Sequence, residues 1–107
     1  MRIPIDAVVA TDKLTGYLLV ARPLDDKSKF LASAGFTQSN PEILESAIRH
    51  LATAAPAKED GNNEYGIFWR VAGQLYGPAG TLQVVTIWLQ WRLDGRFRFI
   101  TLKPLRK

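Results

Sequence analysis

The sequence contains no cysteine, a single histidine and no long apolar run. Without cysteine there is no disulfide, no thiolate metal ligand and no cysteine nucleophile. Because His50 has no second histidine or cysteine to complete a ligand set, we expect no metal site and no cofactor. The start lacks the apolar core of a signal peptide, and no run approaches the ~20 residues of a membrane helix. We therefore expect a soluble, cytoplasmic protein with no membrane contact.

Recognisable catalytic motifs are also missing. The glycine-rich residues 77–80 have neither the length nor the lysine of a phosphate-binding loop. No Gly-x-Ser-x-Gly nucleophile elbow occurs. Asp25 and Asp26 are adjacent, and neighbouring side chains do not normally face one site, so helix capping explains them better than paired acid–base catalysis.

Acidic residues are missing from the C-terminal end of the chain, where none follows Asp94. Residues 1–63 carry seven basic and eight acidic side chains, whereas residues 64–107 carry seven basic and two acidic ones. A positive field concentrated in one half favours anionic partners, and nucleic acid above all. Many small soluble domains are equally basic without such a partner, so charge alone leaves the partner open.

The composition is that of a globular domain. The chain has 107 residues, of which 47% are apolar and 22% charged, and this size is typical of a single core. We expect one domain over residues 1–107. It divides into a helical half (1–55), a mobile loop (56–63) and an antiparallel sheet (64–104).

The first half predicts three helices. The first begins at Thr11 or Asp12 and is broken at Arg22-Pro23. The second covers residues 27–34, with Asp25 and Asp26 as caps and Gly35 as terminator. The third is the best defined, because Asn40 caps it, Pro41 occupies its first position, an apolar stripe follows and Pro56 ends it.

The second half predicts strands over 65–71, 82–93 and 96–103, with a short strand or extended arm at 3–9. Residues 77–80 form one turn, and Asp94-Gly95 is typical of a two-residue type I′ hairpin loop. The expected fold class is therefore α+β, with about three N-terminal helices packed on one face of a C-terminal antiparallel sheet of three to four strands.

The Asp94-Gly95 turn allows the two faces of the last hairpin to be assigned, since it places Leu93 opposite Arg96. The face with Val85, Ile87 and Leu89 is then the predicted core. The opposite face is a candidate nucleic-acid-binding surface, on which aromatics would stack on bases and cations would bind phosphates. Its residues are Trp88, Arg92, Phe97, Phe99 and Lys103.

A structural explanation of the same residues stays open. Aromatic residues favour strands, and the face would then be half covered by the N-terminal arm. Trp91 beside Arg98 would be a cation–π pair. In the first hairpin, a four-residue turn places Trp69 beside Trp88 and sends Arg70 toward the core side. We expect the reverse register, because a core arginine would need a partner.

The candidate catalytic residues are Lys27, Lys29, His50 and Thr101. Metal-free RNA cleavage uses the 2′-hydroxyl as internal nucleophile, so a protein needs only to position it and stabilise phosphate charge. Such a site leaves little spacing signature. For His50 the alternative is a structural role near the end of the third helix, where it complements the dipole.

Several motifs together resemble a family of small bacterial proteins of unknown function, common in cyanobacteria, that also occurs as a module at the ends of toxin-like proteins. The motifs are Lys13-Leu14-x-x-Tyr17-Leu18-Leu19, Asp26-Lys27-Ser28-Lys29-Phe30-Leu31 with Gly35-Phe36, Tyr65-Gly66, Gly73-x-Leu75-x-Gly77-Pro78-x-Gly80, Thr86-Ile87-Trp88 and Phe99-Ile100-Thr101-Leu102-x-Pro104. The resemblance covers nearly the whole chain, and it implies no settled activity.

More remotely, helices followed by an antiparallel sheet resemble the barnase–EndoU–colicin–RelE superfamily of metal-free ribonucleases and toxins. This resemblance implies a role for Lys27, Lys29, Thr101 and the arginines of the sheet. The sequence departs from those nucleases because it lacks a clear His/Glu or His/Lys pair.

Two hypotheses follow. The first is an RNA-binding or metal-independent ribonuclease-like domain of toxin type. The second is a non-enzymatic interaction module, which would form a homodimer or bind a toxin-related protein partner. A small-molecule-binding module is a third and weaker option.

Overall fold

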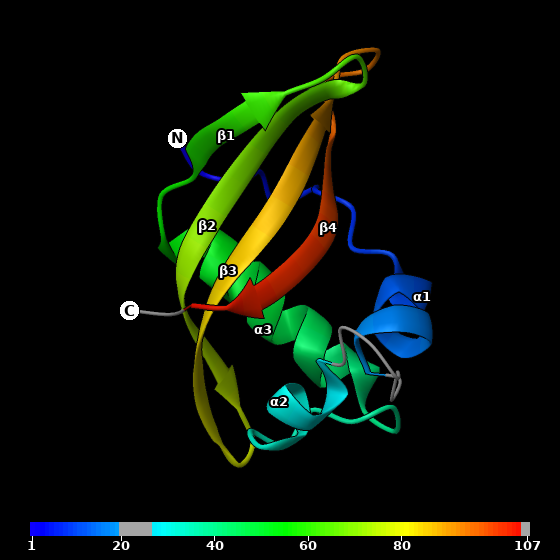
Figure 1. The fold of residues 1–107 in the computed structure, drawn as a ribbon, viewed down its shortest axis with the longest axis vertical. Coiled ribbons are helices and arrows are strands. Elements are labelled where there is room, and N and C mark those ends of the chain that lie inside the picture. Colours follow the sequence, from blue (N-terminus) through cyan, green and yellow to red (C-terminus); the bar gives the residue numbers. More distant parts are fainter. Residues whose placement is uncertain (20–26, 106–107) are drawn as a thin grey trace.

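A computed structural model, which describes residues 1–19 and 27–105, is built around one antiparallel sheet (Figure 1). Each strand pairs with the next one along the chain, so the order is β1-β2-β3-β4. Such a meander needs only short hairpin connections. The strands are β1 (Lys58–Asn62), β2 (Gly66–Gly77), β3 (Gly80–Trp91) and β4 (Phe97–Pro104).

Within the described residues only one helix is long. This helix, α3 (Pro41–Ala54), has 14 residues and starts at Pro41 as predicted. The others are α1 (Thr11–Lys13), which continues into the π-helical turn η1 (Leu14–Leu18), and α2 (Ser28–Ala32). The predicted caps Asp25 and Asp26 and the predicted break at Arg22-Pro23 lie outside the described residues.

The prediction of three N-terminal helices packed on one face of the sheet is therefore wrong. The protein is a four-stranded antiparallel sheet with a small helical part, of which α3 in mid-chain is the main element. Short helices are marginal without tertiary support. The expected connecting loop at 56–63 also differs, because β1 occupies most of it.

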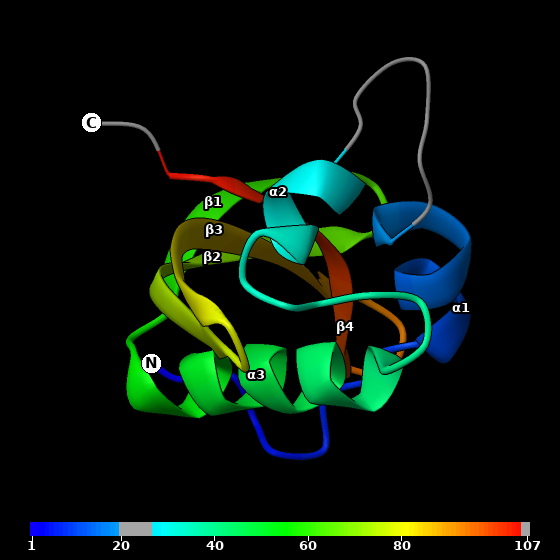
Figure 2. The same cartoon turned by 90° about the horizontal axis from the view of Figure 1, so that it is seen from below.

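One face of the sheet is covered by α3 and by the N-terminal arm, residues 1–9 (Figures 1 and 2). We call it the covered face. The helix approaches β2 closely, since a Cβ on Gly73 would lie 2.7 Å from Leu51 Cδ1. The fully buried residues Leu44 and Ile48 come from α3, and Val71 and Val84 from the strands.

The N-terminal arm is fastened to the rest of the fold at both ends. Val8 forms a parallel bridge with β4, in which its N–H donates to Phe97 O and its carbonyl accepts from Phe99 N–H, both at 2.8 Å. At the other end, Ala57 N–H donates to Met1 O at 2.6 Å. The arm is thus extended, and it makes one bridge instead of a full strand.

The core lies on the face that we predicted to be a binding surface. Trp88, Phe97 and Phe99 are buried on the covered face, and this assignment of faces was wrong. The loop between β3 and β4 is also longer than the predicted Asp94-Gly95 turn, because Trp91 pairs with Arg96 through Trp91 N–H and Arg96 O. Large aromatic side chains contribute most to core burial, and this outweighs the alternation with polar residues on which the prediction relied.

A β-bulge at Ile100 divides β4 into two parts. Before it, Phe99 pairs with Trp88; after it, Thr101 pairs with Ile87. An extra residue in one strand turns all the following side chains to the opposite face. Leu102 consequently joins Phe99 in the core, whereas Thr101 and Lys103 project from the other face.

The first hairpin has the register that we did not favour. Gly77 pairs with Gly80 and Trp69 with Trp88, as a four-residue turn requires. The expected reversal is wrong. Arg70 nevertheless avoids the core, because the face that it shares with Ile87 is the one without a helix.

A short hydrogen-bond chain lies beneath the covered face. Trp88 Nε1–H donates to Thr86 Oγ1 at 2.9 Å, and Thr86 Oγ1 donates to Val71 O, also at 2.9 Å. Both side chains are fully buried, with relative exposures of 0%. A buried indole N–H without an acceptor would lose its hydration uncompensated. The threonine hydroxyl therefore links the tryptophan of β3 to the backbone of β2.

We expect Thr86→Val to lower the free energy of unfolding by about 1–3 kcal/mol, because it leaves Trp88 Nε1–H unpaired. Thr86→Ser keeps the hydroxyl and removes one methyl, at a cost of about 1 kcal/mol. Urea denaturation monitored by fluorescence would compare the two variants. A valine variant at least as stable as the serine variant would contradict this role for the hydroxyl.

Candidate functional site

The candidate site is the face of the sheet that points toward the viewer in Figure 1, which we call the open face; α2 lies only at its border. Its cross-strand rows over β2, β3 and β4 are Phe68–Leu89–Arg98, Arg70–Ile87–Thr101 and Ala72–Val85–Lys103. The middle strand thus contributes an apolar row, of which Leu89 and Val85 are buried and Ile87 is half-buried, and the two flanking strands present cations.

Strands β2, β3 and β4 contain no acid, whereas β1 contains Glu59 and Asp60. Between Gly66 and Pro104 the only acidic residue is Asp94, in the loop between β3 and β4. The basic residues of β2 and β4, namely Arg70, Arg98 and Lys103, all project from the open face. Lys58 of β1 pairs with Arg70 and helps to line a hollow of about 330 Å³. The open face therefore presents a positive field.

At the border of the open face, α2 meets β4. Lys27, which precedes α2, donates from Nζ to Thr101 Oγ1 at 3.2 Å across a sequence separation of 74 residues. Both residues are partly buried. The bulge at Ile100 makes this contact possible, since it turns Thr101 outward. An ammonium group and a hydroxyl are thus held together on a cationic surface. The single hydroxyl proton of Thr101 is donated to Leu102 O at 3.4 Å, so it reaches an anion only after the hydroxyl rotates, whereas an ammonium group has three protons to donate.

At the other end of the open face, Arg98 lies over Trp91, with its guanidinium carbon 5.0 Å from the ring centroid. The predicted cation–π pair is confirmed. Arg98 also meets Asp94, with Nη2 3.6 Å from Oδ2, and about two fifths of each side chain stays exposed. The guanidinium is thus held in place by a ring and a loop carboxylate, and its charge is partly compensated.

The four predicted catalytic residues do not converge. Lys27 and Thr101 are in contact, and Lys29 is exposed nearby in α2. His50 lies on α3, in the layer that packs on the covered face, where its ring is 6.5 Å from the ring of Tyr76. The sheet separates His50 from Thr101, so the two cannot act on one bond.

The predicted nucleic-acid-binding residues are divided between the core and the surface. Trp88, Phe99 and Phe97 have relative exposures of 0%, 2% and 6%, so none can stack on a base. Arg92 is exposed in the loop after β3, where Nη2 donates to Asn63 O at 3.0 Å. Of the set, only Lys103 projects from the open face.

Arg70 and Arg98, which were site candidates only as arginines of the sheet, and Phe68, which was not a candidate, share the open face with Thr101. A signal for the two arginines was present in the sequence. An unpaired cation is costly in a core, so basic residues on acid-free strands identify the face that stays open to solvent.

A metal centre has no support in the described ranges 1–19 and 27–105, where no group of three His, Asp or Glu side chains could hold an ion. Among the helices that the structure describes, none is long and apolar enough to cross a membrane.

Comparisons with known proteins connect the chain to a family and to solved structures. The model of a family described as "Domain of unknown function (DUF6883)" matches residues 5–106. The fold is similar to a chain of a "Contact-dependent growth inhibition toxin - immunity protein complex from Klebsiella pneumoniae 342", with a TM-score of 0.71 and 20% identity, covering 92% of this chain and 100% of that one. Curated protein sequences gave no match. At this identity the likeness shows a shared fold, and neither finding adds evidence for the barnase–EndoU–colicin–RelE superfamily.

We expect the open face to bind polyanions through its cations. The double variant Arg70→Gln/Lys103→Gln should bind heparin at least tenfold more weakly than the wild type at low salt, and with a shallower salt dependence. The control Arg2→Gln/Lys13→Gln removes the same charge outside the open face. Fluorescence anisotropy at several salt concentrations would measure both. Equal losses in the two variants would show that only net charge matters.

Proposed function

We propose that this chain, which belongs to the family of domains of unknown function DUF6883, is a toxin-type domain that binds RNA on its open face and cleaves it without a metal ion. The contact between Lys27 Nζ and Thr101 Oγ1, beside the cations of the acid-free strands β2 and β4, carries the proposal. It brings together two of the residue types that such cleavage can use, from segments that are remote in sequence.

The proposed reaction is an internal transfer. The ribose 2′-oxygen attacks the adjacent phosphorus, the bond from phosphorus to the 5′-oxygen breaks, and a 2′,3′-cyclic phosphate forms. Water takes the proton of the 2′-hydroxyl, and the departing 5′-oxygen gains a proton from water. Negative charge increases on the non-bridging oxygens, where Lys27 and Thr101 would donate hydrogen bonds. Positioning of the 2′-oxygen in line with the leaving group would supply the remaining part of the rate acceleration.

Binding would depend on the strands around this pair. Arg70 lies in the same cross-strand row as Thr101, about 10 Å away across two strand spacings. Lys103 lies two residues further along β4, about 7 Å from Thr101. Such spacing suits several phosphates of one strand. Because Trp88, Phe97 and Phe99 are buried, recognition would rest on the backbone, and we expect little sequence preference.

We expect purified protein to cleave total RNA at low salt in the presence of EDTA. Thr101→Val and Lys27→Gln should each lower the cleavage rate about a hundredfold, since each removes a donor to the phosphate. His50→Ala should cleave at the wild-type rate, because His50 lies in the other layer. Gel analysis with a 2′-deoxy substrate completes the test, since that substrate has no internal nucleophile. Wild-type cleavage rates in the Thr101→Val variant would refute the assignment.

A protein partner is the second candidate function. One similar solved structure belongs to a toxin–immunity protein complex, and the open face carries cations beside the half-buried Phe68 and Ile87. Charge complementarity would select an acidic partner. This alternative requires no catalysis, so it explains equally well why the predicted catalytic residues fail to converge.

For this alternative we expect co-purification with an acidic protein encoded beside this gene. The charge reversal Arg70→Glu/Lys103→Glu should abolish the complex, because it places like charges in the contact. Arg2→Glu/Lys13→Glu, with the same change in net charge, should leave it intact. Size-exclusion chromatography with light scattering measures both. A strictly monomeric protein that forms no complex would count against a partner role.

A further inference from the structure

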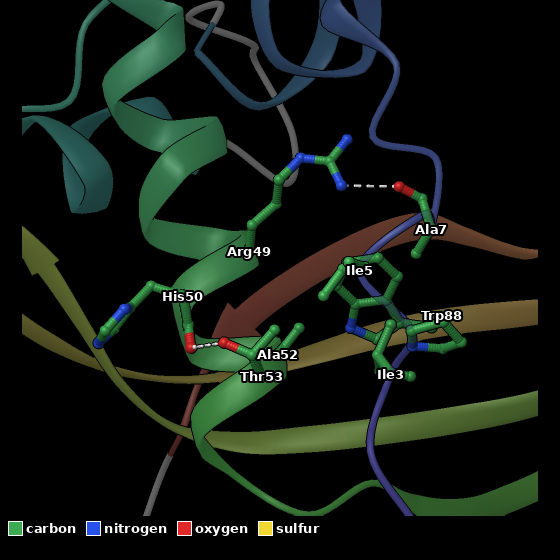
Figure 3. A pocket seen from close by; sticks show the side chains of 9 residues that line it. Ile3, Ile5, Ala7, Arg49, His50, Ala52, Thr53 and Trp88 are labelled. Carbon is green, nitrogen blue, oxygen red and sulfur yellow. Dashed lines mark hydrogen bonds between the residues drawn. The ribbon is translucent and has the colours of Figure 1, made fainter.

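A second hollow lies on the other side of the sheet, between the N-terminal arm and α3 (Figure 3). Its volume is about 290 Å³. The apolar residues that line it include Ile3, Ala7 and Trp88, which are all buried, and Ala52 from α3. Ile5 also lines it and is 85% exposed, so this residue forms part of the mouth.

The hollow exists because α3 carries a small residue there. The other buried residues of this helix include Leu44, Ile48 and Leu51, whereas position 52 is alanine. The arm does not close onto the space, since the bond from Ala57 N–H to Met1 O and the Val8 bridge to β4 fasten it at both ends. The N-terminal arm, which is fastened at both ends, thus keeps an apolar space open between itself and α3.

Three polar residues around the hollow have partners within the protein, and the ring of His50 points away from Ile3 and Trp88 and lies 6.5 Å from the ring of Tyr76 (Figure 3). Trp88 Nε1–H donates to Thr86, and Thr53 Oγ1 donates to His50 O at 3.0 Å. Arg49 donates from Nη1 to Ala7 O at 2.7 Å and from Nε to Glu45 at 3.0 Å. An occupant would find apolar contact and no uncompensated charge, which disfavours anions and nucleotides.

We propose that this hollow is a binding site for a small, uncharged, apolar molecule of one or two rings. The volume of the hollow limits the size of the ligand. An apolar cavity of about 150 Å³ is enough for benzene, and this hollow is larger. A helix or strand of a partner could not enter, because the arm crosses the site and is fastened on both sides. The site lies on the face opposite Lys27 and Thr101, so the inference is independent of the proposed function.

Titration of the protein with fluorobenzene, followed by ¹⁹F NMR and by the indole N–H signal of Trp88, tests the proposal. We expect saturable binding with a Kd of about 1 mM or tighter, as suits a ligand of this size. Ala52→Leu should weaken binding at least tenfold by filling the hollow. Ala54→Leu is the matched control, because it makes the same change at an exposed position of α3, and it should bind as the wild type does.

A second variant keeps the test decisive if Ala52→Leu does not fold. Ile5→Ser alters only the exposed mouth, and it should weaken binding several-fold while leaving the melting temperature unchanged in the absence of ligand. Chemical shifts that still change linearly, without saturation, at fluorobenzene concentrations ten-fold above the expected Kd would overturn the proposal. Equal affinities of the wild type and a folded Ala52→Leu variant would overturn it as well.

Discussion

The bulge at Ile100 is the constraint on which the two faces of the sheet depend. Without it, β4 would alternate regularly, and Phe99 and Leu102, three residues apart, would lie on opposite faces. The extra residue places both in the core, beside Trp88 and Thr86. It also turns Thr101 and Lys103 outward. The same backbone irregularity therefore completes the core and creates the contact between Lys27 and Thr101.

The unequal sizes of the two layers follow from this core. Trp88, Phe97 and Phe99 gather on one face, which requires a cover, and α3 with the N-terminal arm supplies it. The apolar residues of the other face, such as Ile87, are flanked by the long side chains of Arg70 in the same row and of Lys103 in the next row. Aliphatic stems of basic residues can shield apolar surface while their charges stay in water. A second helical layer is therefore unnecessary, and the open face stays available.

The sequence allowed the local features to be predicted and left the tertiary ones undetermined. Asn40-Pro41 and the apolar stripe located α3, and the period of two located β2, β3 and β4. The short helical segments were overestimated, because their ends depend on docking; Ala79 N–H, for instance, donates to Ala34 O. The face assignment failed because it took the aromatic residues Trp88, Phe97 and Phe99 for a binding surface, whereas they are buried in the core. Lys27 and Thr101 were both named as candidates, but no local pattern could predict their contact.

The spacing of the basic residues in β4 predicts the bulge better than the hydrophobic periodicity of this strand does. Arg98 and Lys103 are five residues apart, so an unbroken strand would send one of them into the core. A buried cation without a partner is far more costly than one irregularity in a ladder. Two basic residues at odd spacing in an acid-free strand thus require a bulge between them. The basic residues of β4 and its aromatics together indicate which face stays open and which face packs.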